Sequence, residues 1–501
     1  MIKKGFDTDK YLEIQSSEIL KRVDNFDKLY LEFGGKICDD LHAARVLPGY
    51  DANAKIKMLE MIKDKSEIVF CISAKDIENG KMRADLGLNY EAMTLKSIND
   101  LRNFGLDVSA IIINRFSGEK KALKFKKYLE NIGVRAFLQN EIEGYPADVD
   151  KIVSEEGYGK NPYVETKKPI VVVTGVGPGS GKMSFCLSQL YHDNVRGMKS
   201  GFSKFETFPI WDLPIDHPVN LAYEASTADI GDVNMIDPFH LQATGAIAVN
   251  YNRDVENFPI LKSILKKIGG DVFASPTEMG VSKARLGIVD DDAVCEASRQ
   301  EIVRRYFRYR KENILGIVEK SVVDKSEKLM QELGVDENYR AVVGASRQAA
   351  VEAEAKDGKG NKGFCCGSAI QIGEDVIQGK NSELLHSESS CIINALKHIS
   401  NIPEDIDLLP ESLINSIKEL KKKIVKNSTP SLDVSEILIA LAISSSTNPS
   451  AKRCIENLPL LYNCEMHTTH LLTRGDENGL RDLGINLTTD ASLTPKIYFR
   501  S

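Results

Sequence analysis

A glycine-rich turn that ends in lysine carries the clearest chemical signal in the chain. The apolar, β-branched run Ile170–Val173 is followed by Thr174-Gly-Val-Gly-Pro-Gly-Ser-Gly-Lys-Met-Ser184. A strand, a glycine turn and a helix in this order let several backbone N–H groups point at one anion, while the lysine reaches the outer phosphate oxygens. We therefore predict a phosphate-binding loop, formed by Gly175, Gly177, Gly179, Ser180, Gly181, Lys182 and Ser184.

This loop departs from the standard nucleotide-binding spacing at two positions. Val176 stands where the first glycine is usual, with Gly175 one place early. Met183 replaces the Ser or Thr that holds Mg²⁺ in the standard loop. The departures favour phosphate binding over a standard ATPase, and a strand-to-helix turn with a solvated lysine is the alternative.

Ionisable residues are frequent in the segment after the loop, and together they could supply acid, base and charge to a substrate pocket. The runs Phe205–Pro218 and Asn234–His240 predict irregular loops, which in enzymes often form active-site walls. Ordered surface loops are the alternative. We expect catalytic roles for Lys182, His217, Asp237 and His240, and substrate contacts from Lys204, Glu206, Asn220, Asn252 and Arg253.

The sequence assigns no metal ligands. Asp290 follows a short apolar run, and a helix N-cap is favoured over a Mg²⁺ ligand there. His467 and His470 lie in a Thr-rich run that predicts a strand, where positions three apart face opposite sides. The nine cysteines include no C-x-x-C pair, so no structural zinc is expected. Four arginines between 304 and 310 predict a solvated helix face within 293–318.

The elements that must position the loop alternate along the first 165 residues. Strands are predicted at 29–33, 67–73, 108–114 and 134–138, with helices at 52–63, 91–104 and 120–131 between them. Such alternation predicts an α/β fold with a mainly parallel, doubly wound sheet that includes the loop strand. We expect a first domain at 1–330, with long loops at 200–245, and a smaller α/β domain at 331–501. A linker is expected at 356–363.

Composition excludes several classes of protein. The 501 residues carry a net charge of −7 and are 42% hydrophobic, which argues against a nucleic-acid or membrane-surface protein. The first residues lack a signal-peptide core, and no run of about 18 apolar residues occurs. We expect a cytoplasmic protein without nucleic-acid or membrane partners, and the sequence leaves a homo-oligomer open.

Long stretches of the chain resemble uncharacterised protein family 0371, also called domain of unknown function 1846. The resemblance rests on the glycine-rich segment and on the runs 186–192, 204–213, 217–224, 234–240, 250–255 and 289–305. It implies a bacterial cytoplasmic protein and no defined activity. Because the loop runs belong to the family's recognisable stretches, the resemblance favours their lining the site.

A weaker likeness to cytidine deaminases covers Gly367–Ile370, Gly379–Glu383 and Cys391. Deaminases need a zinc ligand and a glutamate at the start of the corresponding helix, plus P-C-x-x-C on the next helix. Ile393 stands where the glutamate should be, and the second motif is absent. The C-terminal domain is thus expected to share at most that topology, without zinc.

Together these features predict an enzyme that binds a small-molecule phosphate ligand, with ATP or another nucleotide plus magnesium as cofactor and phosphoryl transfer as the reaction. A regulatory nucleotide binder is one alternative. The other is a nucleotide-independent enzyme that acts on a phosphorylated metabolite.

Overall fold

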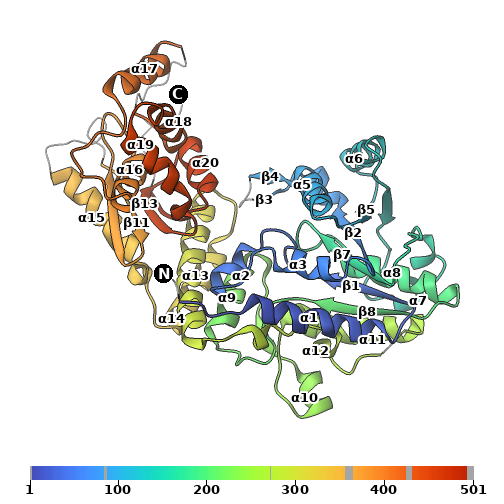
Figure 1. Ribbon diagram of the computed structural model, residues 1–501. Coiled ribbons are helices and arrows are strands. Elements are labelled where there is room, and N and C mark those ends of the chain that lie inside the picture. Colours follow the sequence, from blue (N-terminus) through green and yellow to red (C-terminus); the bar gives the residue numbers. More distant parts are fainter. Residues whose placement is uncertain (1–2, 84–86, 271, 356–364, 425–430, 493–501) are drawn as a thin grey trace. The chain divides into compact units, whose positions relative to one another are not determined.

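The computed structural model describes residues 3–83, 87–270, 272–355, 365–424 and 431–492 (Figure 1). The chain divides into two units, Lys3–Ser298 and Arg299–Ser501, and the division falls within helix α13 (Asp291–Ile314). Among the described helices, none is long and apolar enough to cross a membrane. The predicted linker at 356–363 lies outside the described residues.

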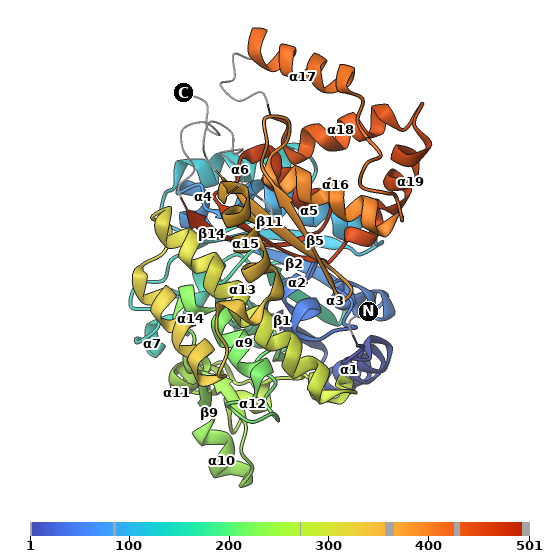
Figure 2. The same cartoon turned by 90° about the vertical axis from the view of Figure 1, so that its left-hand side faces the viewer.

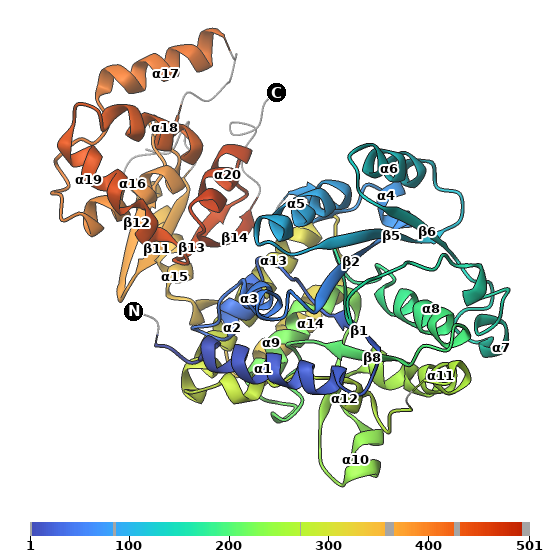
Figure 3. The same ribbon diagram turned by 45° about the vertical axis from the view of Figure 1, so that its right-hand side comes forward.

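A six-stranded, wholly parallel sheet forms the centre of the N-terminal unit. Its strand order is β6-β5-β2-β7-β1-β8, so the predicted loop strand lies inside the sheet as β7. Every residue of β1 and β2 is buried, because helices cover both faces (Figure 3). The predicted α/β class and parallel sheet are thus confirmed. The strands are β1 Lys28–Phe33, β2 Ser66–Ser73, β5 Val108–Phe116, β6 Ala136–Asn140, β7 Ile170–Gly175 and β8 Ser200–Phe205.

The core of this unit fixes the helix that follows β7. Tyr30 of β1 and Val173 of β7 belong to one apolar cluster with Phe185 of α8 and Phe258 of α11. The helices are α1 Thr8–Val23, α2 Leu41–Val46, α3 Ala54–Met61, α4 Ala74–Glu78, α5 Tyr90–Asn103, α6 Lys120–Asn131, α7 Val149–Ile152, α8 Lys182–Val195, α9 Pro218–Ser226, α10 Pro238–Thr244, α11 Asn252–Ile268 and α12 Pro276–Met279.

The strand order creates a topological switch point at the carboxyl edge of the sheet. From β2 the chain continues to β5 on one side, whereas from β7 it continues to β8 on the other. The connections that follow these two neighbouring strands therefore diverge. Ligands of open parallel sheets bind in the crevice that such a divergence leaves.

The segment after β8 is more regular than the sequence indicates. Residues 206–217 form no helix or strand, as expected. However, β9 (Asn234–Ile236) pairs with β10 (Val249–Tyr251), and α10 begins at Pro238. The prediction of a loop over Asn234–His240 is therefore wrong. Asp237 caps α10 and Pro238 is its first residue, where the missing N–H of proline costs nothing.

The C-terminal unit contains a second, mixed sheet of order β12-β11-β13-β14, which confirms a smaller α/β domain. Strand β11 is antiparallel to both neighbours, and β13 is parallel to β14. Figure 2 shows α16 beside β11. The elements are α14 Lys320–Glu332, α15 Ala341–Ala355, β11 Gly367–Ile372, β12 Asp375–Lys380, α16 Ser387–Ile399, α17 Glu411–Lys423, α18 Val434–Ser444, α19 Pro449–Asn457, β13 Glu465–His470, α20 Arg474–Asp482 and β14 Asn486–Ser492. Two short antiparallel strands of two residues each, β3 Met82–Arg83 and β4 Leu88–Asn89, belong to the first unit.

The arginines of α13 do not form the solvated face that the sequence predicts. Arg304 and Arg305 are each only 9% exposed, and both pair with Glu301. Arg304 also pairs with Glu465 of β13. Buried guanidinium groups need such carboxylate partners to offset their lost hydration.

Candidate functional site

The glycine loop, defined as residues 175–184, joins β7 to α8 at the carboxyl edge of the sheet. Gly179 and Gly181 adopt φ values of +74° and +84°, a region that favours glycine. Gly181 is the residue immediately before α8, and Lys182 is the first residue of the helix. The chain thus turns sharply at its glycines and presents Lys182 at the helix N-terminus.

Neighbouring elements hold the glycine loop in this conformation. Asn114 of β5 donates a hydrogen bond from Nδ2 to the Ser180 carbonyl oxygen at 2.7 Å. A Cβ on Gly181 would lie 2.6 Å from the Asn114 Cβ, and one on Gly177 would lie 2.6 Å from the Tyr90 hydroxyl. These close approaches explain why the loop uses glycine at positions 177 and 181.

The N-terminus of α8 is open. Within the described ranges, the backbone N–H groups of Lys182, Met183 and Ser184 donate to no protein acceptor, and no side chain caps the helix. The Ser184 hydroxyl accepts a hydrogen bond from Gln139 at 3.2 Å. Open N–H groups and the helix dipole favour an anion at such an end. The donors available to that anion are therefore backbone groups and Lys182.

A charged cluster lies at the same edge of the sheet and consists of Glu32, Lys204, Glu206, Tyr251 and Asp254. Lys204 is the last residue but one of β8, and its ammonium pairs with Asp254 and lies 3.8 Å from Glu206. Tyr251 accepts a hydrogen bond from Lys204 at 3.0 Å and donates one to Glu206 at 2.9 Å. Glu32 stands beside Lys204 in the register of β1 and β8.

The charges of this cluster shift one another's protonation. Burial opposes the charge on Lys204, but Asp254, Glu206 and Glu32 outweigh it and hold the lysine pKa above its ordinary value. Burial raises the pKa of Glu206 to about 6, Lys204 opposes the rise, and Asp254 and Glu32 add to it. A carboxyl group with a pKa near neutrality can exchange protons with a substrate, which suits general acid–base chemistry.

Both Lys182 of the glycine loop and Glu32 of the charged cluster act on the pKa values of two buried thiols. Burial raises the pKa of Cys71 on β2 to about 12, Lys182 opposes the rise, and Glu32 adds to it. Cys186 of α8 has its pKa raised by burial, and the same two groups act on it with the same signs. Since β1 lies between β7 and β8, Glu32 stands between the loop strand and Lys204.

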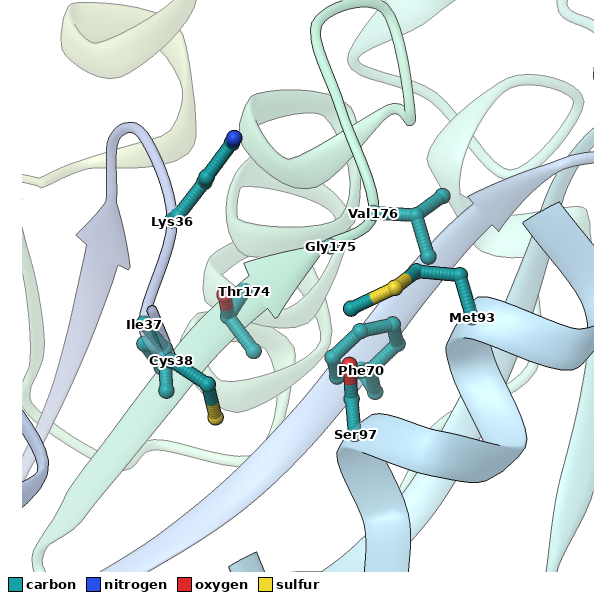
Figure 4. A pocket seen from close by; sticks show the side chains of 9 residues that line it. All are labelled: Lys36, Ile37, Cys38, Phe70, Met93, Ser97, Thr174, Gly175 and Val176. Carbon is teal, nitrogen blue, oxygen red and sulfur yellow. The ribbon is translucent and has the colours of Figure 1, made fainter. Parts of the chain in front are cut away.

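A hollow opens on the other side of the loop strand, at the switch point. It is small, with about 20 Å³ of space for the centre of a water molecule, and its lining includes Thr174 and Gly175 of β7. Figure 4 shows Phe70, Met93 and Val176 gathered on one side of it, with Ile37 and Cys38 on the other. This lining is mostly apolar, with Lys36, Ser97 and Thr174 as its polar members.

The three residues predicted as catalytic outside the loop occupy structural positions. Asp237 is fully buried and accepts hydrogen bonds from the backbone of Phe239 and His240 and from Thr277. The His240 ring contacts Ser275 at 3.2 Å. His217 precedes α9 and accepts the Val219 N–H. Across the described residues, none of the three contacts Lys182.

The predicted substrate residues divide into two sets. Lys204 and Glu206 lie in the charged cluster. Asn220 instead stabilises the irregular segment 206–217, because its side-chain amide accepts from and donates to the Ile210 backbone. Asn252 accepts the Val233 N–H, and Arg253 forms a bidentate ion pair with Asp232.

Asp290 caps α13 through the Ala293 N–H and also pairs with Lys3. The helix N-cap that the sequence favours at this position is therefore present.

Among the residues that the structure describes, two groups of side chains come close enough together to hold a metal ion. In the first, His217 Nε2 lies 3.4 Å from Asp291 and 3.6 Å from Cys295 Sγ. The second group comprises His386, Glu388 and Asp476. The Val219 N–H occupies the Nδ1 lone pair of His217, so a neutral ring carries its proton on Nε2 and cannot ligate there.

The second group forms a buried polar network at the start of α16. Glu388 accepts hydrogen bonds from the hydroxyls of Ser368, Ser387 and Thr468, and Asp476 accepts them from His386 and the Val434 N–H. Both carboxylates are thus engaged. The helix begins at Ser387, so Glu388 and not Ile393 lies in its first turn.

Sequence reasoning missed three members of the site: Glu32, Tyr251 and Asp254. A charged residue in the otherwise apolar end of β1, Leu29–Phe33, was an available signal for Glu32. Tyr251 and Asp254 carried no such signal, because they reach β8 from the start of α11 through tertiary folding.

Comparison with known proteins assigns the chain to a protein family. The model of the N-terminal part of domain of unknown function DUF1846 matches residues 4–334, and that of its C-terminal part matches residues 338–499. Relatives named UPF0371 protein, from Clostridium botulinum strains Alaska E43 and Eklund 17B, are each 48% identical over 504 residues and cover all of both chains. One from strain Langeland is 46% identical and covers 99% of each chain. The chain therefore belongs to the DUF1846 family, as its motifs indicated.

Proposed function

We propose that the N-terminal unit is a phosphate-binding enzyme that transfers a phosphoryl group from ATP or another nucleotide to a small metabolite. The observation that carries the proposal is the open N-terminus of α8, with Lys182 as its first residue and three N–H groups that have no acceptor in the described chain. Backbone donors and a lysine at such a site neutralise phosphate charge during transfer.

The charged cluster supports an enzyme over a passive binder. Glu206, with its pKa raised to about 6 by burial, can accept a proton from an attacking hydroxyl, and Lys204 supplies positive charge beside it. The hollow next to Gly175 places a mostly apolar surface beside the glycine loop, against which a nucleotide ring could pack. The acceptor metabolite would then enter from the β8 side of the loop.

A regulatory nucleotide binder is the second candidate, and Met183 favours it. A thioether cannot replace the hydroxyl that holds Mg²⁺ in a standard loop, so hydrolysis would be weak. Product formation from ATP separates the two candidates, because a regulator binds the nucleotide without consuming it.

A melting-temperature screen of the full chain tests the proposal. Nucleotides, inorganic phosphate and phosphorylated metabolites would be compared with and without MgCl₂. A ligand at about 100 times its Kd stabilises the native state by about 2.7 kcal/mol, which should raise the Tm by several degrees. A screen in which phosphate compounds leave the Tm unchanged would count against the proposal. A response to phosphorylated metabolites alone would favour a nucleotide-independent enzyme.

A further inference from the structure

Glu32 is a buried residue, and one of its two carboxylate oxygens has no hydrogen-bond donor in the described part of the chain. The residue is 7% exposed, and in the described part of the chain its Oε2 atom is buried without a partner. Its neighbours across the sheet are Val173 of β7, which offers no polar side chain, and Lys204 of β8. Leaving a buried carboxylate oxygen unpaired costs free energy, and a ligand bound to that oxygen would remove this cost.

The charges around Glu32 leave an excess of negative charge. Three carboxylates, those of Glu32, Glu206 and Asp254, face the single ammonium group of Lys204. Lys204 is already engaged by Asp254 and Tyr251. A further cation would therefore relieve the repulsion between Glu32 and Glu206.

We propose that Glu32 helps to hold a divalent cation, Mg²⁺ by its chemistry, which binds together with the phosphate ligand of the glycine loop. This inference rests on the proposed function and deepens it. Mg²⁺ is commonly held by one or two carboxylates, phosphate oxygens and water, all hard oxygen donors. Because Met183 removes the usual hydroxyl ligand, a carboxylate on the strand next to β7 supplies the oxygen that the loop lacks.

Mn²⁺ serves as the probe, since its binding to the full chain can be followed by electron paramagnetic resonance with and without ATP. Glu67→Gln is the matched control for Glu32→Gln. Glu67 is also buried in the same sheet, at the amino end of β2, and its carboxylate accepts the Lys168 N–H at 2.7 Å. We expect Glu32→Gln to weaken Mn²⁺ binding in the presence of ATP at least tenfold and Glu67→Gln to leave it unchanged.

A second readout separates a ligand from a merely structural carboxylate. Without metal, ATP should bind Glu32→Gln as tightly as wild type or more tightly, because the repulsion between Glu32 and phosphate is gone. Circular dichroism checks that each variant folds. Glu32→Asp, which keeps the charge on a shorter side chain, should weaken Mn²⁺ binding less than Glu32→Gln does.

The outcomes distinguish the cation site from the proposed function. Equal Mn²⁺ affinity in wild type and Glu32→Gln, with ATP bound, would overturn the cation site and leave the proposed function standing. If wild type binds neither ATP nor inorganic phosphate, the proposed function fails. In that case, Mn²⁺ binding that depends on Glu32 would still support the cation site, and its absence would overturn it.

Discussion

At the scale of single residues, Lys204 and Glu206 show how a strand end creates reactive groups. Lys204 is the last polar residue of β8, so its side chain leaves the sheet at the carboxyl edge, where it meets Glu206 and Asp254. From the residue types alone, the sequence predicted that Lys204 and Glu206 would contact a substrate. Asp254 joins them only because α11 packs against β8, and Glu32 joins them only because β1 pairs with β8, and a local sequence pattern encodes neither arrangement.

The first residue-scale prediction concerns the pH dependence of stability through Glu206. Its folded pKa of about 6 exceeds the ordinary value of 4.5, so the folded protein retains a proton that the unfolded chain has released. The free energy of unfolding therefore falls as pH rises through this window, by about 1–2 kcal/mol from this group. Glu206→Gln should remove that loss.

Urea unfolding at pH 4.5 and about 7.5 measures this effect. The wild type should lose more stability across the window than Glu206→Gln does. Glu13→Gln, on an exposed position of α1, is the control that should behave as wild type. Parallel pH profiles for wild type and Glu206→Gln would show that the Glu206 pKa is not raised by folding.

The second residue-scale prediction concerns Asp237, whose carboxylate caps α10 and anchors Thr277. Asp237→Ala leaves several half-buried donors without an acceptor and should cost about 2–4 kcal/mol of unfolding free energy. Affinity for phosphate ligands should stay within twofold of wild type. Urea titration and calorimetry measure the two effects. A variant of unchanged stability that no longer binds or turns over ligand would instead support the catalytic role predicted from the sequence.

At the scale of elements, hydrophobic periodicity predicted the parallel sheet well. The helix expected at 120–131 is α6 with those bounds, and the strand expected at 108–114 is β5, two residues longer. The short elements β9 and α10 were missed because three- and seven-residue runs carry little periodicity. The site was only partly predictable, since the loop is contiguous in sequence whereas Glu32 joins it through strand order.

The element-scale prediction concerns the turn into α8. Gly179 and Gly181 both have positive φ, but a Cβ on Gly179 meets nothing within 4 Å, whereas one on Gly181 meets Asn114 at 2.6 Å. Gly179→Ala should cost about 1 kcal/mol of unfolding free energy from backbone strain, and Gly181→Ala should cost at least twice that. Urea titration of both variants measures the difference. Equal costs would mean that Asn114 does not constrain the loop.

At the scale of the whole molecule, the chain has two units with separate sheets and cores. The family models meet between residues 334 and 338, close to the predicted boundary at 330, whereas the units divide at Ser298. Both the glycine loop and the charged cluster lie in the first unit. A role for the second unit does not follow from its buried polar network.

The whole-molecule prediction is that ligand protection maps to the first unit. Hydrogen exchange with saturating ATP and MgCl₂ should slow in peptides that cover 28–36, 170–190 and 200–207, since binding opposes local opening there. Peptides from 367–492 should exchange at the unliganded rate. Protection of equal size in that C-terminal range would argue for a ligand site outside the glycine loop.

The most direct test of the central claim is a calorimetric titration of ATP into the full chain and into Lys182→Ala. Lys120→Ala is the matched control, because Lys120 is the first residue of α6, another helix that follows a strand of the same sheet. Loss of one charge-assisted hydrogen bond should weaken ATP binding to Lys182→Ala by more than about 1 kcal/mol, roughly fivefold. Lys120→Ala should bind as wild type does. Equal affinity in wild type and Lys182→Ala would contradict phosphate binding at the glycine loop.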